Sequence, residues 1–228
     1  DRARFEHIDE EPLKLYAAMC ASLDENIGKV LDALDAHGLT ENTLIAFVSD
    51  NGPAATGFKG SDKEWGNIVL GSTGGLRNRK ASVYEGGIRV PYILSWPAKL
   101  PAGKVCTLPV TTLDLYPTFC AAAGVAPPKK ATLDGENLLP ILEGKEKPDA
   151  RKFYWYNLQR GAIRRGDWKL VIFEGKSPRT ELYNLAKDRG ETTDVSKKNP
   201  ALMKELQAAW TTWKESLPER ADQSQGRW

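Results

Sequence analysis

The sequence lacks any apolar run close to the roughly 20 residues that a membrane-spanning helix needs. It also lacks an excess of one charge, because 32 basic residues stand against 30 acidic ones and the net charge is +2. Proteins that bind nucleic acid usually carry a basic stripe, whereas basic and acidic residues are mixed along this chain. We therefore expect neither a membrane span nor a nucleic-acid partner.

Histidine and cysteine are scarce as well. His7 and His37 stand in a polar stretch and at a predicted helix end, which indicates solvated side chains. The three cysteines, Cys20, Cys106 and Cys120, lack the spacing of metal ligands, and their odd number leaves at least one thiol unpaired. We predict buried thiols, with one disulfide plus a free thiol as the alternative, and neither reveals the redox compartment.

What the chain does contain is the composition of a globular protein, with 41% hydrophobic and 27% charged residues among 228. Apolar residues recur every three or four positions over 12–37 and Gly38 follows, which predicts a helix with a glycine stop. The apolar runs 44–49 and 90–95 lack alternation, which is typical of strands covered on both faces of a parallel sheet.

The pattern changes after a charged linker at 143–150. Short aromatic-rich runs separated by Gly, Asp and Pro predict an antiparallel meander, and an amphipathic helix is predicted over 200–217. The predicted fold class is therefore α/β. Part of a mostly parallel α/β sheet domain spans 1–146, and a small α+β domain with an antiparallel sheet and a terminal helix spans 147–228.

The first apolar run ends directly at Asp50-Asn51-Gly52. Such a cluster usually makes a turn, but a hairpin needs an alternating strand after Gly52, and none follows. Open α/β sheets bind ligands at the carboxyl ends of their strands, and carboxylate and amide oxygens suit Ca²⁺ or Mg²⁺. Asp50 and Asn51 are therefore candidate metal ligands. Because Ca²⁺ takes about six to eight oxygen ligands, a complete site needs further acidic residues from elsewhere.

A second candidate region follows the glycine-rich stretch 52–79, which is long enough to indicate a functional loop. Lys80 stands beside two arginines, and a lysine ammonium can hold a sulfate or phosphate oxygen; a solvated basic loop is the alternative. Gly86-Gly87 permits close backbone approach. The neighbours Glu85 and Arg89 predict a supporting ion pair, and Lys63 and Trp65 in the long loop are candidate substrate contacts.

Two stretches together, "TLIAFVSDNGP" at 43–53 and "GSTGGLRNRKASVYEGGIRVPYILSWP" at 71–97, resemble the C-terminal half of the type I sulfatases. These are the arylsulfatase-like branch of the alkaline phosphatase superfamily. The later segments "LDLYPTFCAAAG", "GAIRRGDWKLV" and "TELYNLAKDRGET" also fit the family, so the resemblance covers nearly the whole chain.

The resemblance implies a role for individual residues. Asp50 and Asn51 match the pair that coordinates a divalent cation, usually calcium with magnesium as the alternative. Lys80 matches the catalytic lysine that contacts the substrate sulfate, and Gly86 and Gly87 match a turn that shapes the site. The family implies a sulfatase acting on a sulfate ester of a carbohydrate or an aryl alcohol, in a periplasmic or secreted location.

The family's nucleophile is a formylglycine made from the first residue of a Cys/Ser-x-Pro/Ala-x-Arg motif. None of the three cysteines begins such a motif, and the paired aspartates and catalytic histidines of the family have no counterpart here. We therefore expect the formylglycine in a missing N-terminal part. Two alternatives remain: a phosphate or phosphonate monoester hydrolase of the same superfamily, and a non-catalytic fragment or pseudoenzyme that binds a sulfated glycan or a partner protein.

The 228-residue chain alone is expected to have no sulfatase activity, because an electrostatic wall without a covalent nucleophile leaves little rate enhancement. The measurement is turnover of 4-nitrophenyl sulfate by the purified chain, with and without calcium. Calcium-dependent turnover that disappears in Asp50→Ala would show that the chain supplies its own nucleophile.

Overall fold

The computed structural model describes residues 1–55, 68–145, 151–157 and 159–218. The chain forms two compact units. The first contains Asp1–Gly74 and Arg89–Asp149, and the second contains Gly75–Ile88 and Ala150–Trp228. The short segment Gly75–Ile88 thus packs with the later part of the chain. The predicted boundary between 146 and 147 lies outside the described residues.

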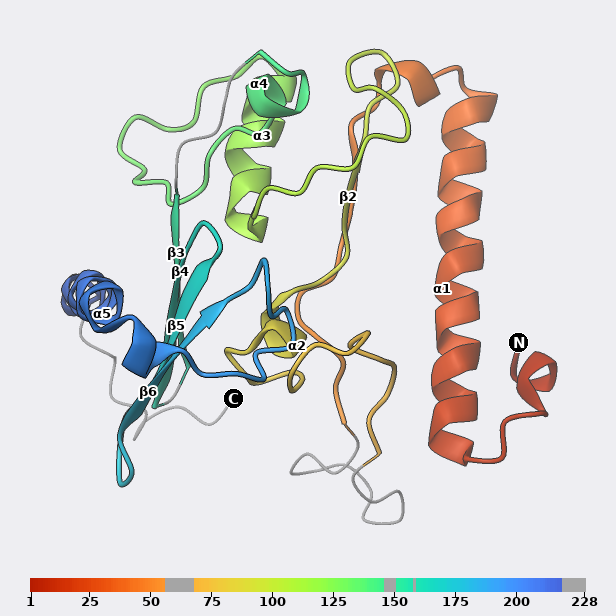
Figure 1. The fold of residues 1–228 in the computed structure, drawn as a ribbon. Coiled ribbons are helices and arrows are strands. Elements are labelled where there is room, and N and C mark those ends of the chain that lie inside the picture. The colour runs from red at the N-terminus through yellow and green to blue at the C-terminus, as the bar shows by residue number, and fades with distance from the viewer. Residues whose placement is uncertain (56–67, 146–150, 158, 219–228) are drawn as a thin grey trace. The chain divides into compact units, whose positions relative to one another are not determined.

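The first unit begins with the long helix α1, Glu11–Ala36 (Figure 1). Pro12 stands in its first turn, where a missing N–H costs nothing. The helix ends where Gly38 adopts φ +65° and donates its N–H to the Asp35 carbonyl at 2.9 Å. The predicted helix and its glycine stop are therefore confirmed.

The strands of the first unit are β1, Ile45–Val48, and β2, Tyr92–Ser95, and both fall within predicted strands. They pair antiparallel, with Ile45 opposite Ser95 and Val48 opposite Tyr92. The expected parallel pairing is therefore wrong for these two strands. The expected cover on both faces is not found either, because no residue of β1 or β2 is buried and Phe47 and Ile93 are exposed. An unbroken apolar run carries no information on the direction of a neighbouring strand or on what covers it.

Short helices complete the first unit. They are η1 Arg2–Phe5, η2 Thr40–Asn42, η4 Thr112–Asp114, α3 Leu115–Ala122 and α4 Leu139–Leu142. Thr111 and Asp114 form a capping box before α3. The buried Asp114 carboxylate also accepts the Glu136 N–H at 2.8 Å. This one side chain therefore connects the start of α3 to the segment that leads into α4.

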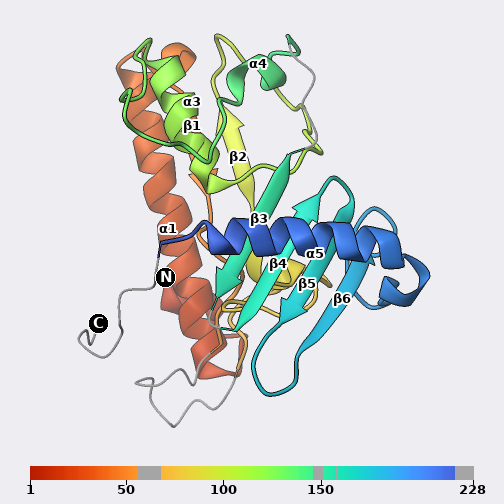
Figure 2. The same ribbon diagram turned by 90° about the vertical axis from the view of Figure 1, so that its left-hand side faces the viewer.

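The second unit is built on a four-stranded antiparallel meander: β3 Lys152–Asn157, β4 Arg160–Arg165, β5 Trp168–Phe173 and β6 Arg179–Asn184. After the short η5, Ser196–Lys198, the helix α5, Pro200–Glu215, crosses the sheet (Figure 2). The predicted meander and terminal helix are therefore confirmed, and with them the α/β class with a small α+β unit.

The alternation of strand side chains gives this sheet two buried faces. One face packs against α5 through Ile163, Leu170, Ile172, Leu182, Leu206 and Trp210. The other packs against the segment Gly75–Ile88, which contains the short helix α2, Glu85–Ile88, through Val83, Tyr84, Ala162, Val171, Tyr183 and Leu185. The segment Gly75–Ile88, which contains Lys80, Gly86 and Gly87, thus forms one layer of the second unit.

The cysteines differ from the prediction of buried thiols. All three are free; Cys20 and Cys106 are exposed and Cys120 is half-buried. Cys20 lies on a stretch of α1 where Met19 and Leu23 are also exposed. Helical spacing predicts which residues share a face, and it does not say whether that face is covered. Among the described residues, no helix combines the length and apolar character needed to cross a bilayer.

Gly161→Ala is expected to destabilise the second unit by about 1–3 kcal/mol through overpacking. A Cβ atom at this position of β4 would lie 2.1 Å from a ring carbon of the buried Trp210. The measurement is urea unfolding followed by tryptophan fluorescence. Gly28→Ala in α1 is the matched control, because its Cβ would have no atom within 4 Å; an equal loss in both variants would contradict the role of the Trp210 contact.

Candidate functional site

Asp50 and Asn51 lie directly after β1, as the sequence predicts. Asp50 is exposed and Asn51 is half-buried. The ladder continues one step beyond β1, because the Ser49 N–H donates to the Pro91 carbonyl at 3.3 Å. The Ser49 hydroxyl donates to the Asn51 carbonyl at 3.0 Å, and Asn51 Nδ2 donates to the Gly52 carbonyl at 3.1 Å. The backbone at the end of β1 is therefore held from both sides.

The donor set of this pair fits a hard cation. The Asn51 amide nitrogen is engaged with the Gly52 carbonyl, so the amide oxygen is the atom left to act as a ligand beside the Asp50 carboxylate. Within the part of the chain that the structure describes, no group of three or more His, Cys, Asp or Glu side chains could hold a metal. The two residues thus fit part of a calcium or magnesium shell, and a complete shell would need further oxygen ligands.

The described residues on either side of 56–67 pair with each other. Ala55 and Val69 form an isolated antiparallel bridge, and the Leu70 N–H donates to the Ala54 carbonyl at 2.8 Å. The candidate substrate contacts Lys63 and Trp65 lie outside the described residues, so their role stays a prediction.

Lys80 lies in the second unit and its side chain is exposed. Two residues close to it, Asn78 and Ala81, adopt φ +66° and +69°, a region that non-glycine residues rarely occupy. The Ser82 N–H donates to the Arg79 carbonyl at 3.1 Å, which closes the turn around Lys80. The lysine is therefore presented by a tight and unusual turn. Its position relative to Asp50 and Asn51 in the other unit stays a prediction.

Gly86 and Gly87 explain how this turn is held. A Cβ atom on Gly86 would lie 2.2 Å from the Asn78 carbonyl oxygen, and one on Gly87 would lie 2.3 Å from the Ser82 carbonyl oxygen. Neither contact tolerates a side chain, so only glycine allows the backbone on both sides of Lys80 to pass so closely over α2.

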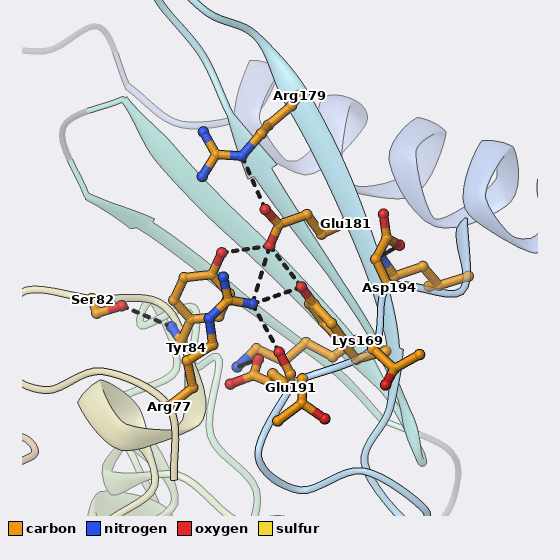
Figure 3. Close-up of polar contacts among 12 residues, drawn as sticks. Arg77, Ser82, Tyr84, Lys169, Arg179, Glu181, Glu191 and Asp194 are labelled. Atoms are coloured by element: carbon orange, nitrogen blue, oxygen red, sulfur yellow. Dashed lines mark hydrogen bonds and ion pairs between the residues drawn. The ribbon is translucent and has the colours of Figure 1, made fainter. Parts of the chain in front are cut away.

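The most buried charges of the second unit include Lys169 and Glu191, which Figure 3 draws near Arg77 and Tyr84. Lys169 of β5 has no exposed surface, and its Nζ lies 2.9 Å from one carboxylate oxygen of Glu85 and 2.9 Å from one of Glu191. Arg164 of β4 lies 3.8 Å from the other oxygen of Glu85. Burial raises the pKa of Glu191, which the charge of Lys169 opposes.

A second polar group begins at Arg77. Its guanidinium lies 3.9 Å from the ring centre of Tyr84 and donates to the Tyr183 hydroxyl at 2.7 Å and to the Glu191 carbonyl at 2.8 Å. Both tyrosines donate to the Glu181 carboxylate, Tyr183 at 2.8 Å (Figure 3). Burial, together with the contact to Glu181, raises the pKa of Tyr84 to about 12, so it stays a donor near neutral pH. Arg77 is therefore a structural residue.

Sequence reasoning identified Glu85 as a supporting carboxylate but did not identify Lys169, Arg164 or Glu191 as members of its cluster. The signal for Lys169 was present in the alternation of β5, where it shares a face with the buried Val171. A lysine at such a position is buried only when it is paired. The predicted pair of Glu85 with Arg89 stays a prediction.

One serine, unlike the three cysteines, begins the nucleophile motif. Ser216-Leu217-Pro218-Glu219-Arg220 satisfies the Ser-x-Pro-x-Arg pattern, although its last two residues lie outside the described ones. The Ser216 hydroxyl ends α5 by donating to the Trp213 carbonyl at 2.6 Å. Because α5 and the Lys80 segment cover opposite faces of the sheet, this serine does not share a site with Lys80.

Comparisons with known proteins match both units. Residues 1–125 match the family model described as "Sulfatase", and residues 77–216 match the model "N-sulphoglucosamine sulphohydrolase, C-terminal". A curated protein named "Sulfatase" from Formosa agariphila is 35% identical over 213 residues, which are 82% of this chain and 36% of that protein.

Solved protein structures are also similar to this chain. The structure of Ps i-CgsB in complex with k-i-k-neocarrahexaose is 34% identical with a TM-score of 0.78, and the match covers 93% of this chain and 45% of that one. The phosphonate monoester hydrolase of Agrobacterium radiobacter is 25% identical with a TM-score of 0.62, over 89% of this chain and 41% of that one. The chain therefore spans less than half the length of each of these proteins.

The stability of the second unit is expected to fall in acid partly through Glu181. Burial opposes ionisation, but the hydrogen bonds from Tyr84, Arg179 and Tyr183 outweigh it and lower the pKa of Glu181 below its usual value near 4.5. A lowered pKa in the folded state contributes stability above the usual value, and this is lost as the pH falls through the lowered one.

The measurement is the free energy of unfolding between pH 7 and pH 3. Glu181→Gln is expected to be less stable at pH 7 and to lose less on acidification than the wild type. Glu215→Gln, an exposed carboxylate of α5 in the same unit, is the control. A Glu181→Gln profile parallel to the wild type would contradict the assignment.

Proposed function

The chain belongs to the sulfatase family, and on that premise we propose that the protein containing it hydrolyses sulfate esters. The observation that carries the proposal is the pair of family matches, which together cover residues 1–216 and include every candidate site residue. Because the chain spans about a third of its curated relative, the activity belongs to a longer protein.

Asp50 and Asn51 are proposed to hold a divalent cation, with calcium preferred and magnesium as the alternative. When bound, the cation would neutralise charge on the sulfate and on the attacking oxygen. The chain's own contribution is the position of the two ligands. The end of β1 and the hydrogen bonds of Ser49 and Asn51 fix the backbone that carries them, so little reorganisation is needed when the cation binds.

Lys80 is proposed to contact the substrate sulfate and to stabilise the charge that grows on its oxygens in the transition state. A preorganised cation is worth most when its position does not change during the reaction. The turn between Asn78 and Ser82 supplies such a position for the backbone of Lys80.

The nucleophile is proposed to be a formylglycine supplied by a part of the protein beyond these 228 residues. None of the three cysteines begins the required motif, and the one serine that does lies across the sheet from Lys80. The substrate is proposed to be the sulfate ester of a carbohydrate or an aryl alcohol. The likeness to a protein solved with k-i-k-neocarrahexaose favours the carbohydrate.

A second candidate is hydrolysis of a phosphonate or phosphate monoester, which the likeness to the Agrobacterium radiobacter enzyme favours. Comparison of kcat/KM for 4-nitrophenyl sulfate and 4-nitrophenyl phenylphosphonate separates the two. A larger value on the sulfate supports the sulfatase, and a larger value on the phosphonate supports the second candidate.

In the full-length protein, Lys80→Ala is expected to lower kcat/KM for 4-nitrophenyl sulfate by about 10²- to 10³-fold, as for the loss of one oxyanion donor. Lys176→Ala is the control, because Lys176 is an exposed lysine between β5 and β6 of the same unit. If Lys80→Ala kept wild-type kinetics, Lys80 would not belong to the site.

A further inference from the structure

The cluster around Lys169 is more elaborate than a supporting ion pair. Lys169, Glu85 and Glu191 are at most 2% exposed, and Arg164 brings a second cation to 3.8 Å from Glu85. Two cations and two carboxylates therefore balance inside the second unit. Lysine and glutamate are almost never fully buried unless paired, so each member of the cluster restricts where the others can lie.

Glu191 holds both ends of the segment that carries Lys80. The Glu85 N–H, at the start of α2, donates to Glu191 Oε2 at 2.6 Å. At the other end, the Arg77 guanidinium donates to the Glu191 carbonyl at 2.8 Å. Glu191 itself adopts φ +53°, a conformation that non-glycine residues rarely adopt. One residue of the loop after β6 thus closes the segment from Arg77 to Glu85 into a ring.

Two backbone N–H groups of α2 also donate hydrogen bonds to this ring. The Gly86 N–H donates to the Arg77 carbonyl at 2.9 Å, and the Gly87 N–H donates to the Tyr84 carbonyl at 2.8 Å. Lys80 is exposed on this ring, between Asn78 and Ala81 with their positive φ angles. The conformation of the Lys80 backbone therefore depends on the hydrogen bonds of Glu191. The buried Glu191 carboxylate in turn depends on Lys169 to neutralise its charge.

We propose that Lys169 and Glu191 are positioning residues for Lys80: the buried cluster holds the Arg77–Glu85 ring in the one conformation that presents the Lys80 ammonium to the substrate sulfate. The inference rests on the proposed function of Lys80. Neither residue is required to touch the substrate. Their effect is transmitted through the backbone, where a displacement of about 1 Å is enough to cost a large part of the rate.

The test is a double-mutant cycle in the full-length protein, with kcat/KM for 4-nitrophenyl sulfate as the readout. Lys169→Met removes the shared cation and is expected to lower kcat/KM by about 10-fold or more. In the Lys80→Ala background, the same change is expected to have an effect of about twofold or less, because the residue it positions is gone. Equal effects in the two backgrounds would overturn the proposal.

Two further variants make the cycle decisive. Glu191→Gln removes one charge but keeps an amide oxygen for the Glu85 N–H, and it replaces Lys169→Met in the cycle if that variant does not fold. Lys214→Met is the matched control, because Lys214 of α5 is also a paired lysine of this unit, with Glu174 as its partner. The control is expected to show the same effect with and without Lys80; coupling as large as that of Lys169→Met would overturn the proposal.

Hydrogen–deuterium exchange separates this proposal from the proposed function. In Glu191→Gln, peptides covering 76–88 are expected to exchange faster while peptides covering β4 and β5 keep their protection. Unchanged exchange over 76–88 overturns the positioning role, whatever the enzyme's activity. A wild-type protein without sulfatase activity, or a Lys80→Ala variant with wild-type kinetics, overturns the proposed function and the catalytic role of Lys80. In either case the exchange result still shows whether Glu191 holds the Arg77–Glu85 ring.

Discussion

A lysine without exposed surface needs negative charge within reach, and Lys169 obtains it from Glu85 and Glu191 at 2.9 Å each. Moving an ion out of water costs several kcal/mol even after relaxation, and breaking a buried pair costs about 3–5 kcal/mol. Separation of the three distant segments that carry Lys169, Glu85 and Glu191 would therefore be energetically costly. The site that we propose around Lys80 depends on that requirement.

The same requirement explains why the second unit is discontinuous in sequence. Glu85 belongs to the segment Gly75–Ile88, while Lys169 and Glu191 follow much later. Val83 and Tyr84 add apolar burial on the same face of the sheet, and Gly86 and Gly87 allow the backbone to pack without side chains in the way. The segment Gly75–Ile88 thus packs on the antiparallel sheet within one unit, although a charged linker and the whole of α3 and α4 lie between them in the chain.

The first unit has a different character. Its only ladder among the described residues has two strands, and such a pair is marginal in isolation. Phe47 and Ile93 face each other across that ladder and are 43% and 57% exposed. Local capping also connects segments of this unit: Asp114 is fully buried, and its carboxylate accepts hydrogen bonds from the Thr111 and Glu136 N–H groups. The candidate metal ligands are thus carried by a short ladder and by the hydrogen bonds at its end.

Features that follow from local periodicity and turn chemistry could be predicted from the sequence. These are α1 with its glycine stop, the meander and α5. They also include the position of Asp50 and Asn51 at the end of a strand and that of Lys80 after a glycine-rich stretch. The antiparallel pairing of β1 with β2, the exposure of Cys20 and the partners of Glu85 became known only from the folded chain. The physical reason is the same in each case. The direction of a neighbouring strand, the burial of a helix face and the partner of a charged side chain all depend on which distant segments meet. The residue pattern of one segment carries no information on the segment that packs against it.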